Sequence, residues 1–244
     1  MRIHIFESER ALATHLATLV AAAVGEQPRL VLGLPTGRTP ILLYRELSRM
    51  AAASGLDLSQ ATTFNLDEFL GLPGTHPASY RQFMETHLFG HVNLPAGHIH
   101  FLDGGATDPE AECARYERAV QEAGGIDLQL LGIGDNGHIG FNEPSETLTA
   151  RTHRVMLDAA TRRANAGLFG GDPEQVPREA LSMGMATILS ARRIVLIATG
   201  AGKAECVRAM IEGPLTTWLP ASFLQVHRDV DVMLDRAAAG KLED

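Results

Sequence analysis

The chain has 244 residues, of which 45% are hydrophobic, 20% charged and 5% aromatic. This composition is that of a globular protein, and it excludes a disordered tail, a collagen-like fibre and a small disulfide scaffold. The formal net charge is −8 and no long run of lysine or arginine occurs. Nucleic acid and anionic membrane surfaces are therefore not expected partners.

Along the chain, short apolar runs alternate with segments of helical periodicity. The alternation predicts an α/β fold in which helices cover both faces of a mostly parallel sheet. The predicted strands are Arg2–Phe6, Leu30–Gly33, Thr62–Asn65, Leu128–Gly132, Ile194–Ala198 and Val230–Leu234. The predicted helices are Ala11–Val24, Pro40–Ala53, Ser79–Leu88, Asp108–Ala123 and Lys203–Ile211.

A single domain over residues 1–244 is the simplest organisation, because no linker or repeat divides the chain. Residues 140–178 are the least regular stretch and are rich in glycine and proline, which is typical of a lid or binding loop. The apolar segment Ala11–Val24 follows Glu7 and Glu9 instead of a basic region, so it is read as an amphipathic helix and not as a signal peptide. We expect a cytoplasmic protein without a membrane span.

Four unusual segments each follow a predicted strand, and ligands of open α/β sheets bind at the carboxyl ends of strands. The first segment is Gly33–Pro40, with the sequence GLPTGRTP. Thr39 is predicted as the N-cap of the next helix and Pro40 as its first residue. Gly37 allows a ligand to approach the backbone, and the free amides of the helix start could bind an anion. The alternative is an ordinary strand-to-helix turn.

The second segment, Thr62–Phe69, ends in two adjacent acids, Asp67 and Glu68. On a strand these side chains point to opposite faces, so at most one of them faces a cleft. A carboxylate there could act as a general base towards a carbon acid. A solvated turn is the alternative.

The third segment, Leu131–Pro144, contains the pattern G-x-G-x-x-G at residues 132–137. Gly140 and Pro144 interrupt the helix that a dinucleotide site requires, so nucleotide binding is not expected. The useful residues are His138 and Glu143, because an imidazole oriented by a carboxylate transfers protons near neutral pH.

The fourth segment, Ala198–Lys203, places a lysine at the start of a helix. A cation opposes the helix dipole there, and an anionic ligand would reverse this cost, although a solvated lysine is the alternative. His98 and His100 could share a strand face, but no third ligand is evident, so no metal site is expected.

Together these motifs resemble the glucosamine-6-phosphate deaminase family, in the family's order and close to its spacing. The string GHIGFNEP at residues 137–144 is the most specific, since the related 6-phosphogluconolactonases continue differently after Gly-His. The other matching segments are Gly33–Pro40, Phe64–Phe69, His76–Tyr80, Gly202–Ala204 and Leu224–His227. The resemblance implies a Rossmann-like fold and conversion of glucosamine 6-phosphate and water to fructose 6-phosphate and ammonia, without a cofactor.

The resemblance also implies roles for individual residues. Asp67 would move a proton between C2 and C1 of the open sugar, and His138 would protonate the ring oxygen. Glu143 would orient His138, with Asn136 as the other neighbour of the imidazole. The substrate-binding residues would be Thr36, Gly37, Arg38, Thr39, Glu68, Gly137 and Lys203.

The sequence departs from the family at Gly167, where an arginine usually grips the phosphate. Arg38, Arg162 or Arg163 could replace it, or the substrate could be a related acidic amino sugar. A lactonase of the same fold and a non-catalytic sugar-phosphate sensor are further alternatives. The longer, allosterically regulated members carry a C-terminal extension beyond Asp244, so that regulation is not expected. A homo-oligomer remains open.

Overall fold

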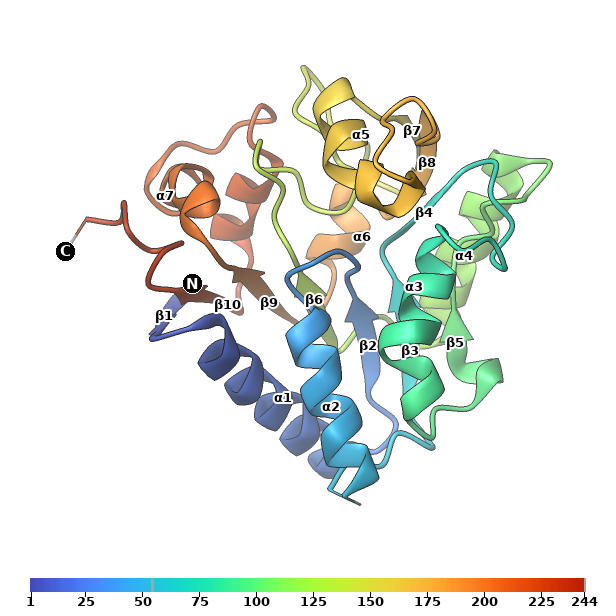
Figure 1. Ribbon diagram of the computed structural model, residues 1–244, viewed down its shortest axis with the longest axis horizontal. Helices are drawn as coiled ribbons and strands as arrows, with labels where there is room; N and C mark the ends of the chain where they lie inside the picture. The colour runs from blue at the N-terminus through green and yellow to red at the C-terminus, as the bar shows by residue number, and fades with distance from the viewer. Residues whose placement is uncertain (54, 244) are drawn as a thin grey trace.

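The computed structural model describes residues 1–53 and 55–243. Seven parallel strands form one sheet in the order β1-β10-β9-β6-β2-β3-β5 (Figure 1). This confirms the predicted fold class. The strands are β1 (Arg2–Phe6), β2 (Val31–Leu34), β3 (Thr62–Asn65), β5 (Ile99–His100), β6 (Leu128–Leu131), β9 (Arg193–Ala198) and β10 (Val230–Asp235).

The five predicted helices are present, with ends displaced by one or two residues. They are α1 (Glu9–Glu26), α2 (Ile41–Ala52), α3 (Tyr80–His87), α4 (Pro109–Glu122) and α7 (Ala204–Glu212). One detail was wrong: Pro40, and not Thr39, is the N-cap of α2, and its carbonyl accepts a hydrogen bond from the amide of Tyr44 at 3.0 Å. None of the helices in the described part of the chain is long and apolar enough to cross a membrane.

Helices cover both faces of the sheet. Successive residues of a central strand point to opposite faces and pack against the helices there. On β9, Ile194 and Leu196 belong to the apolar cluster that includes residues of α4 and α7. Val195 and Ile197 belong to the cluster that includes residues of α1 and α2. Those two helices lie side by side (Figure 1). The continuous apolar runs of the sequence therefore correspond to strands that are buried on both faces.

A second, antiparallel sheet lies above the first in Figure 1, with the order β4-β8-β7. Its strands are β4 (Asp67–Phe69), β8 (Glu179–Ser182) and β7 (His153–Met156). The stretch 140–178, expected to be irregular, carries β7, the helix α5 (Ala159–Asn165) and a 3₁₀ turn at Ala166–Phe169. These elements are too short for their periodicity to stand out from the sequence. Closure of the stretch over a ligand stays a prediction.

A buried carboxylate on β10 connects the three strands at one edge of the main sheet. Asp231 is 1% exposed and accepts hydrogen bonds from Arg2 of β1 (Nε, 2.7 Å) and Arg193 of β9 (Nη2, 2.7 Å), while Nε2 of His4 lies 2.8 Å from it. Burial raises the pKa of Asp231, but the hydrogen bonds from Arg2, His4 and Arg193 outweigh it and hold the pKa well below its usual range. Asp231 therefore stabilises the folded state as an anion.

We expect Asp231→Asn to lower the free energy of unfolding at pH 7 by ~1–2 kcal/mol, since solvent screens the half-exposed arginines. The folded pKa lies below the unfolded value of about 3.9, so this stabilisation is present above about pH 4 and is lost as the pH falls further. Urea unfolding at several pH values measures it. Asp229→Asn, which removes a single contact to Arg2, is the control with a smaller expected effect. An unchanged unfolding curve for Asp231→Asn at pH 7 would contradict this account.

Candidate active site

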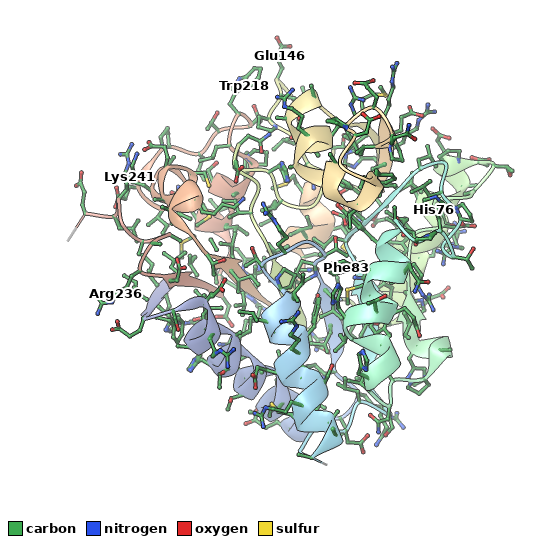
Figure 2. The ribbon with its side chains drawn as sticks, viewed as in Figure 1. His76, Phe83, Glu146, Trp218, Arg236 and Lys241 are labelled. Atoms are coloured by element: carbon green, nitrogen blue, oxygen red, sulfur yellow. The ribbon has the colours of Figure 1, made fainter. Side chains whose placement is uncertain are left out.

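A cavity of about 480 Å³ collects residues from all four unusual segments of the sequence. The segments follow β2, β3, β6 and β9, which are neighbours in the sheet, so parallel pairing brings their carboxyl ends to one edge. The opposite wall comes from α3 and α5, and Figure 2 labels one of its side chains, Phe83 of α3. The lining includes Thr36, Gly37, Arg38, Thr39, Asp67, His138 and Lys203.

Asp67 is a carboxylate with little access to water. It is 7% exposed at the start of β4, and no hydrogen bond to its carboxylate occurs among the residues that the structure describes. Burial, and then the negative charge of Glu68, raise the pKa of Asp67 to about 8. A base of that strength in a cavity can remove a proton from a carbon next to a carbonyl group.

Glu68 points away from the cavity, as the alternation along a strand predicts. Its carboxylate accepts backbone hydrogen bonds from Phe69 (2.8 Å), Tyr80 (2.9 Å) and Arg81 (2.9 Å). The last two amides belong to the first turn of α3, where donors have no partner within the helix. Burial raises the pKa of Glu68 to about 7, although these three donors oppose the rise. Glu68 therefore fixes α3, which supplies Tyr80 and Phe83 to the cavity wall.

His138 lies beside a carboxylate that is itself held by two donors. Nδ1 of His138 is 3.3 Å from Oε2 of Glu143. The same carboxylate accepts hydrogen bonds from Nδ2 of Asn136 (2.8 Å) and from the hydroxyl of Thr161. Burial raises the pKa of Glu143, but the hydrogen bonds and charge of His138, Thr161 and Asn136 lower it by more. The pKa of Glu143 is therefore below its usual value. Glu143 is therefore an anion that can orient the imidazole and stabilise its protonated form.

Asn136 is placed differently from the expectation. Its amide donates to Glu143, and its oxygen accepts from the backbone amide of His138 at 3.2 Å, so it holds the loop and not the imidazole. The imidazole packs directly on Gly134, where an added Cβ would come within 2.3 Å of the ring. Gly134 is thus required for the close approach of His138 to the backbone, and the glycine pattern serves a histidine and not a nucleotide.

The first loop and Lys203 face the cavity from different strands. Gly37 has a φ of 97°, and the loop leads into the amino end of α2, which favours an anion. Nζ of Lys203 donates to the carbonyl of Ile133 at 2.6 Å and pairs with Asp135 at 2.6 Å. Gly137 lies outside the lining, where its carbonyl accepts from the backbone of Ala221 and Leu219 packs against its Cα.

Two cavity residues have contacts that no short motif could reveal. Thr161 on α5 is 18 residues from Glu143 in sequence and bonds to it directly. The hydroxyl of Tyr80 donates to Asn165 at 2.9 Å and so joins α3 to α5. Tyr80 belonged to a matching motif, but nothing in the sequence indicated its partner.

Gly167 lines the cavity and, as a glycine, contributes no side chain to its wall. Of the arginines considered as replacements, Arg38 also lines the cavity. Arg162 donates to the carbonyl of Pro173 at 3.2 Å and lies 3.4 Å from Glu174, outside the lining. Across residues 1–53 and 55–243, no three His, Cys, Asp or Glu side chains are grouped so that they could hold a metal ion.

A family model described as glucosamine-6-phosphate isomerases/6-phosphogluconolactonase matches residues 6–233. The chain belongs to this family. It is 48% identical over 242 residues to the glucosamine-6-phosphate deaminase of Halothermothrix orenii, covering 99% of this chain and 100% of the relative. It is also 48% identical over 244 residues to glucosamine-6-phosphate deaminase 2 of Bacillus subtilis, covering 100% and 98%.

Solved structures agree with this assignment. A structure described as a monomeric glucosamine-6-phosphate deaminase matches with a TM-score of 0.95 and 43% identity, covering 99% of this chain and 100% of that one. A 6-phosphogluconolactonase from Thermotoga maritima matches with a TM-score of 0.75 at 18% identity, covering 96% and 98%, which shows the shared fold. The resemblance inferred from the motifs is thereby confirmed at the level of the family.

The raised pKa of Asp67 has a cost in stability. Its folded pKa of about 8 exceeds the unfolded value of about 3.9, so the folded state binds more protons and loses stability as the pH rises between them. We expect Asp67→Asn to raise the melting temperature near pH 8, with a difference from wild type that shrinks towards pH ~4. Thermal unfolding across this range measures it, with Glu122→Gln on the surface of α4 as the control. A difference in melting temperature that does not change with pH would contradict the raised pKa of Asp67.

Proposed function

We propose that this chain is an amino-sugar-phosphate deaminase–isomerase that converts glucosamine 6-phosphate and water to fructose 6-phosphate and ammonia. The observation that carries the proposal is the desolvated carboxylate of Asp67 in the same cavity as His138 and the anion-binding loop. Full-length relatives at 48% identity carry the name of this activity.

The reaction must begin by opening the sugar ring, because the closed ring hides the carbonyl at C1. His138 donates a proton to the ring oxygen, and the negative charge of Glu143 supports the protonated imidazole. The hydroxyl on C1 loses its proton to water as the C1–O5 bond breaks, which leaves an aldehyde. The proton on C2 is then acidic enough for a positioned base.

Asp67 removes the proton from C2, the electron pair forms a C1–C2 double bond, and the C1 oxygen takes up a proton from water to give an enol. The same carboxyl group returns the proton to C1, so the double bond moves to C2 and its nitrogen. Water adds to C2, ammonia leaves, and the ketone of fructose 6-phosphate remains. A carboxyl group with a pKa near 8 suits both directions of this transfer, since it can bind and release the proton near neutral pH.

The phosphate is bound by Thr36, Gly37, Arg38, Thr39 and Lys203, all of which line the cavity. Arg38 supplies the guanidinium that is absent at Gly167, because it is the arginine placed in the lining. Contacts to the unreactive phosphate orient C1 and C2 against Asp67, which is how remote binding energy lowers a barrier. The two sheets provide the rigid frame for this alignment.

The cellular setting follows from the substrate. A sugar phosphate carries charge that prevents it from crossing an apolar bilayer, so the enzyme is placed in the cytoplasm with its substrate. The similarity to a deaminase described as monomeric favours a chain that acts alone, and a homo-oligomer is the alternative.

The direct test measures ammonia and fructose 6-phosphate released from glucosamine 6-phosphate. We expect both products in equal amounts, and Asp67→Asn should lower turnover by ~10²–10⁴-fold while substrate binding persists. Glu122→Gln should act as wild type.

Full activity of Asp67→Asn would exclude Asp67 as the base. Galactosamine 6-phosphate tests for a deaminase of a related amino sugar, and 6-phosphogluconolactone tests for a lactonase. Turnover of the lactone alone, without ammonia, would replace the proposal with a hydrolase. Thermal stabilisation by glucosamine 6-phosphate without turnover would indicate a sensor.

A further inference from the structure

Lys203 does not face the cavity as a free cation. Its ammonium group donates a hydrogen bond to the carbonyl of Ile133 at 2.6 Å and forms an ion pair with the carboxylate of Asp135 at an N···O distance of 2.6 Å. The side chain of Lys203 is 21% exposed, whereas that of Asp135 is 81% exposed. Asp135 thus brings a solvated negative charge to the end of a lysine that lines an anion-binding cavity.

The position of Asp135 places its charge close to any anion on Lys203. Asp135 itself lines the cavity, on the loop between β6 and His138. An anion bound by Nζ of Lys203 would lie about 5 Å from the Asp135 carboxylate, because both groups would contact the same nitrogen. At such separations two like charges repel measurably even through water. Arg38, which is exposed on the loop after β2, lies in no ion pair among the described residues.

We propose that Asp135 is a specificity-determining residue of the phosphate subsite, which holds Lys203 against Ile133 and weakens the binding of a doubly charged phosphate. The inference rests on the proposed function, in which Lys203 binds the phosphate of the sugar. Asp135 leaves Lys203 as a hydrogen-bond donor of fixed position while offsetting part of its charge. Arg38 then supplies most of the net attraction for the anion.

The chemistry of the reaction gives this arrangement a purpose. Substrate and product carry the same phosphate, so attraction beyond what orients the sugar binds both equally and lowers the barrier no further. A subsite with two uncompensated cations would hold the product as firmly as the substrate and slow its release. Partial neutralisation by Asp135 keeps the orienting contact and shortens the lifetime of the product complex.

The test compares Asp135→Asn with two controls. Asp135→Glu keeps the charge, and Glu122→Gln removes one negative charge from the surface of α4, away from the cavity. Calorimetry gives the dissociation constant of fructose 6-phosphate at about pH 5.5 and about pH 7.5, on either side of the second phosphate pKa of about 6. The KM for glucosamine 6-phosphate is measured alongside.

We expect Asp135→Asn to bind fructose 6-phosphate about 3- to 10-fold more tightly at the higher pH, and to lower KM without raising kcat. The gain should be smaller at the lower pH, where the phosphate carries one charge. Asp67, His138, His87 and the Cys206 thiol behind Lys203 also face this region. These groups are the same in all variants. The ratio of the dissociation constants of variant and wild type therefore reports the effect of Asp135 alone.

Unchanged or weaker binding by Asp135→Asn would overturn the proposal, since a residue that only positions Lys203 would raise the dissociation constant at both pH values. Inorganic phosphate as a second probe keeps this test separate from the proposed reaction. If wild type binds inorganic phosphate but converts no amino sugar, the proposed function fails, and the comparison of variants with inorganic phosphate still decides the role of Asp135.

Discussion

The cavity depends on the burial of two adjacent carboxylates, Asp67 and Glu68, which follow strand β3. Moving a carboxylate out of water is costly unless donors replace the water. Glu68 has three backbone donors, two of them from the start of α3, and so becomes part of the frame. Asp67 has no such compensation among the described residues, and its pKa rises to about 8. One carboxylate supports the site and the other is left reactive.

The same separation of roles extends through the site. Glu143 accepts hydrogen bonds from its neighbours and remains an anion beside His138. Asp67 accepts none among the described residues and binds a proton readily. The parallel sheet makes the contrast useful, because adjacent strands bring the two proton-transfer groups and the anion-binding loop to one edge. The charge of Lys203 is likewise adjusted by a neighbour, because Asp135 forms an ion pair with it.

Much of this site could be predicted from the sequence, because each of the four segments directly follows a predicted strand. The opposite directions of Asp67 and Glu68 follow from strand alternation alone. The bond from Thr161 to Glu143 could not be predicted, since it joins segments whose meeting depends on how α5 packs. The strands of the small sheet have three or four residues each, too few for a pattern. The N-cap of α2 was misplaced because proline is compatible with either position at a helix start.

The reactivity of the site depends on the protonation of Asp67, which a carboxyl titration by nuclear magnetic resonance measures directly. Protein labelled with ¹³C at the aspartate carboxyl groups is titrated from about pH 4 to about pH 9, and Asp67→Asn identifies the resonance by its absence. We expect a midpoint near 8, displaced from the usual aspartate value of about 3.9. A midpoint near the usual value would show that the carboxylate is well solvated or has donors, and would contradict the account of its reactivity.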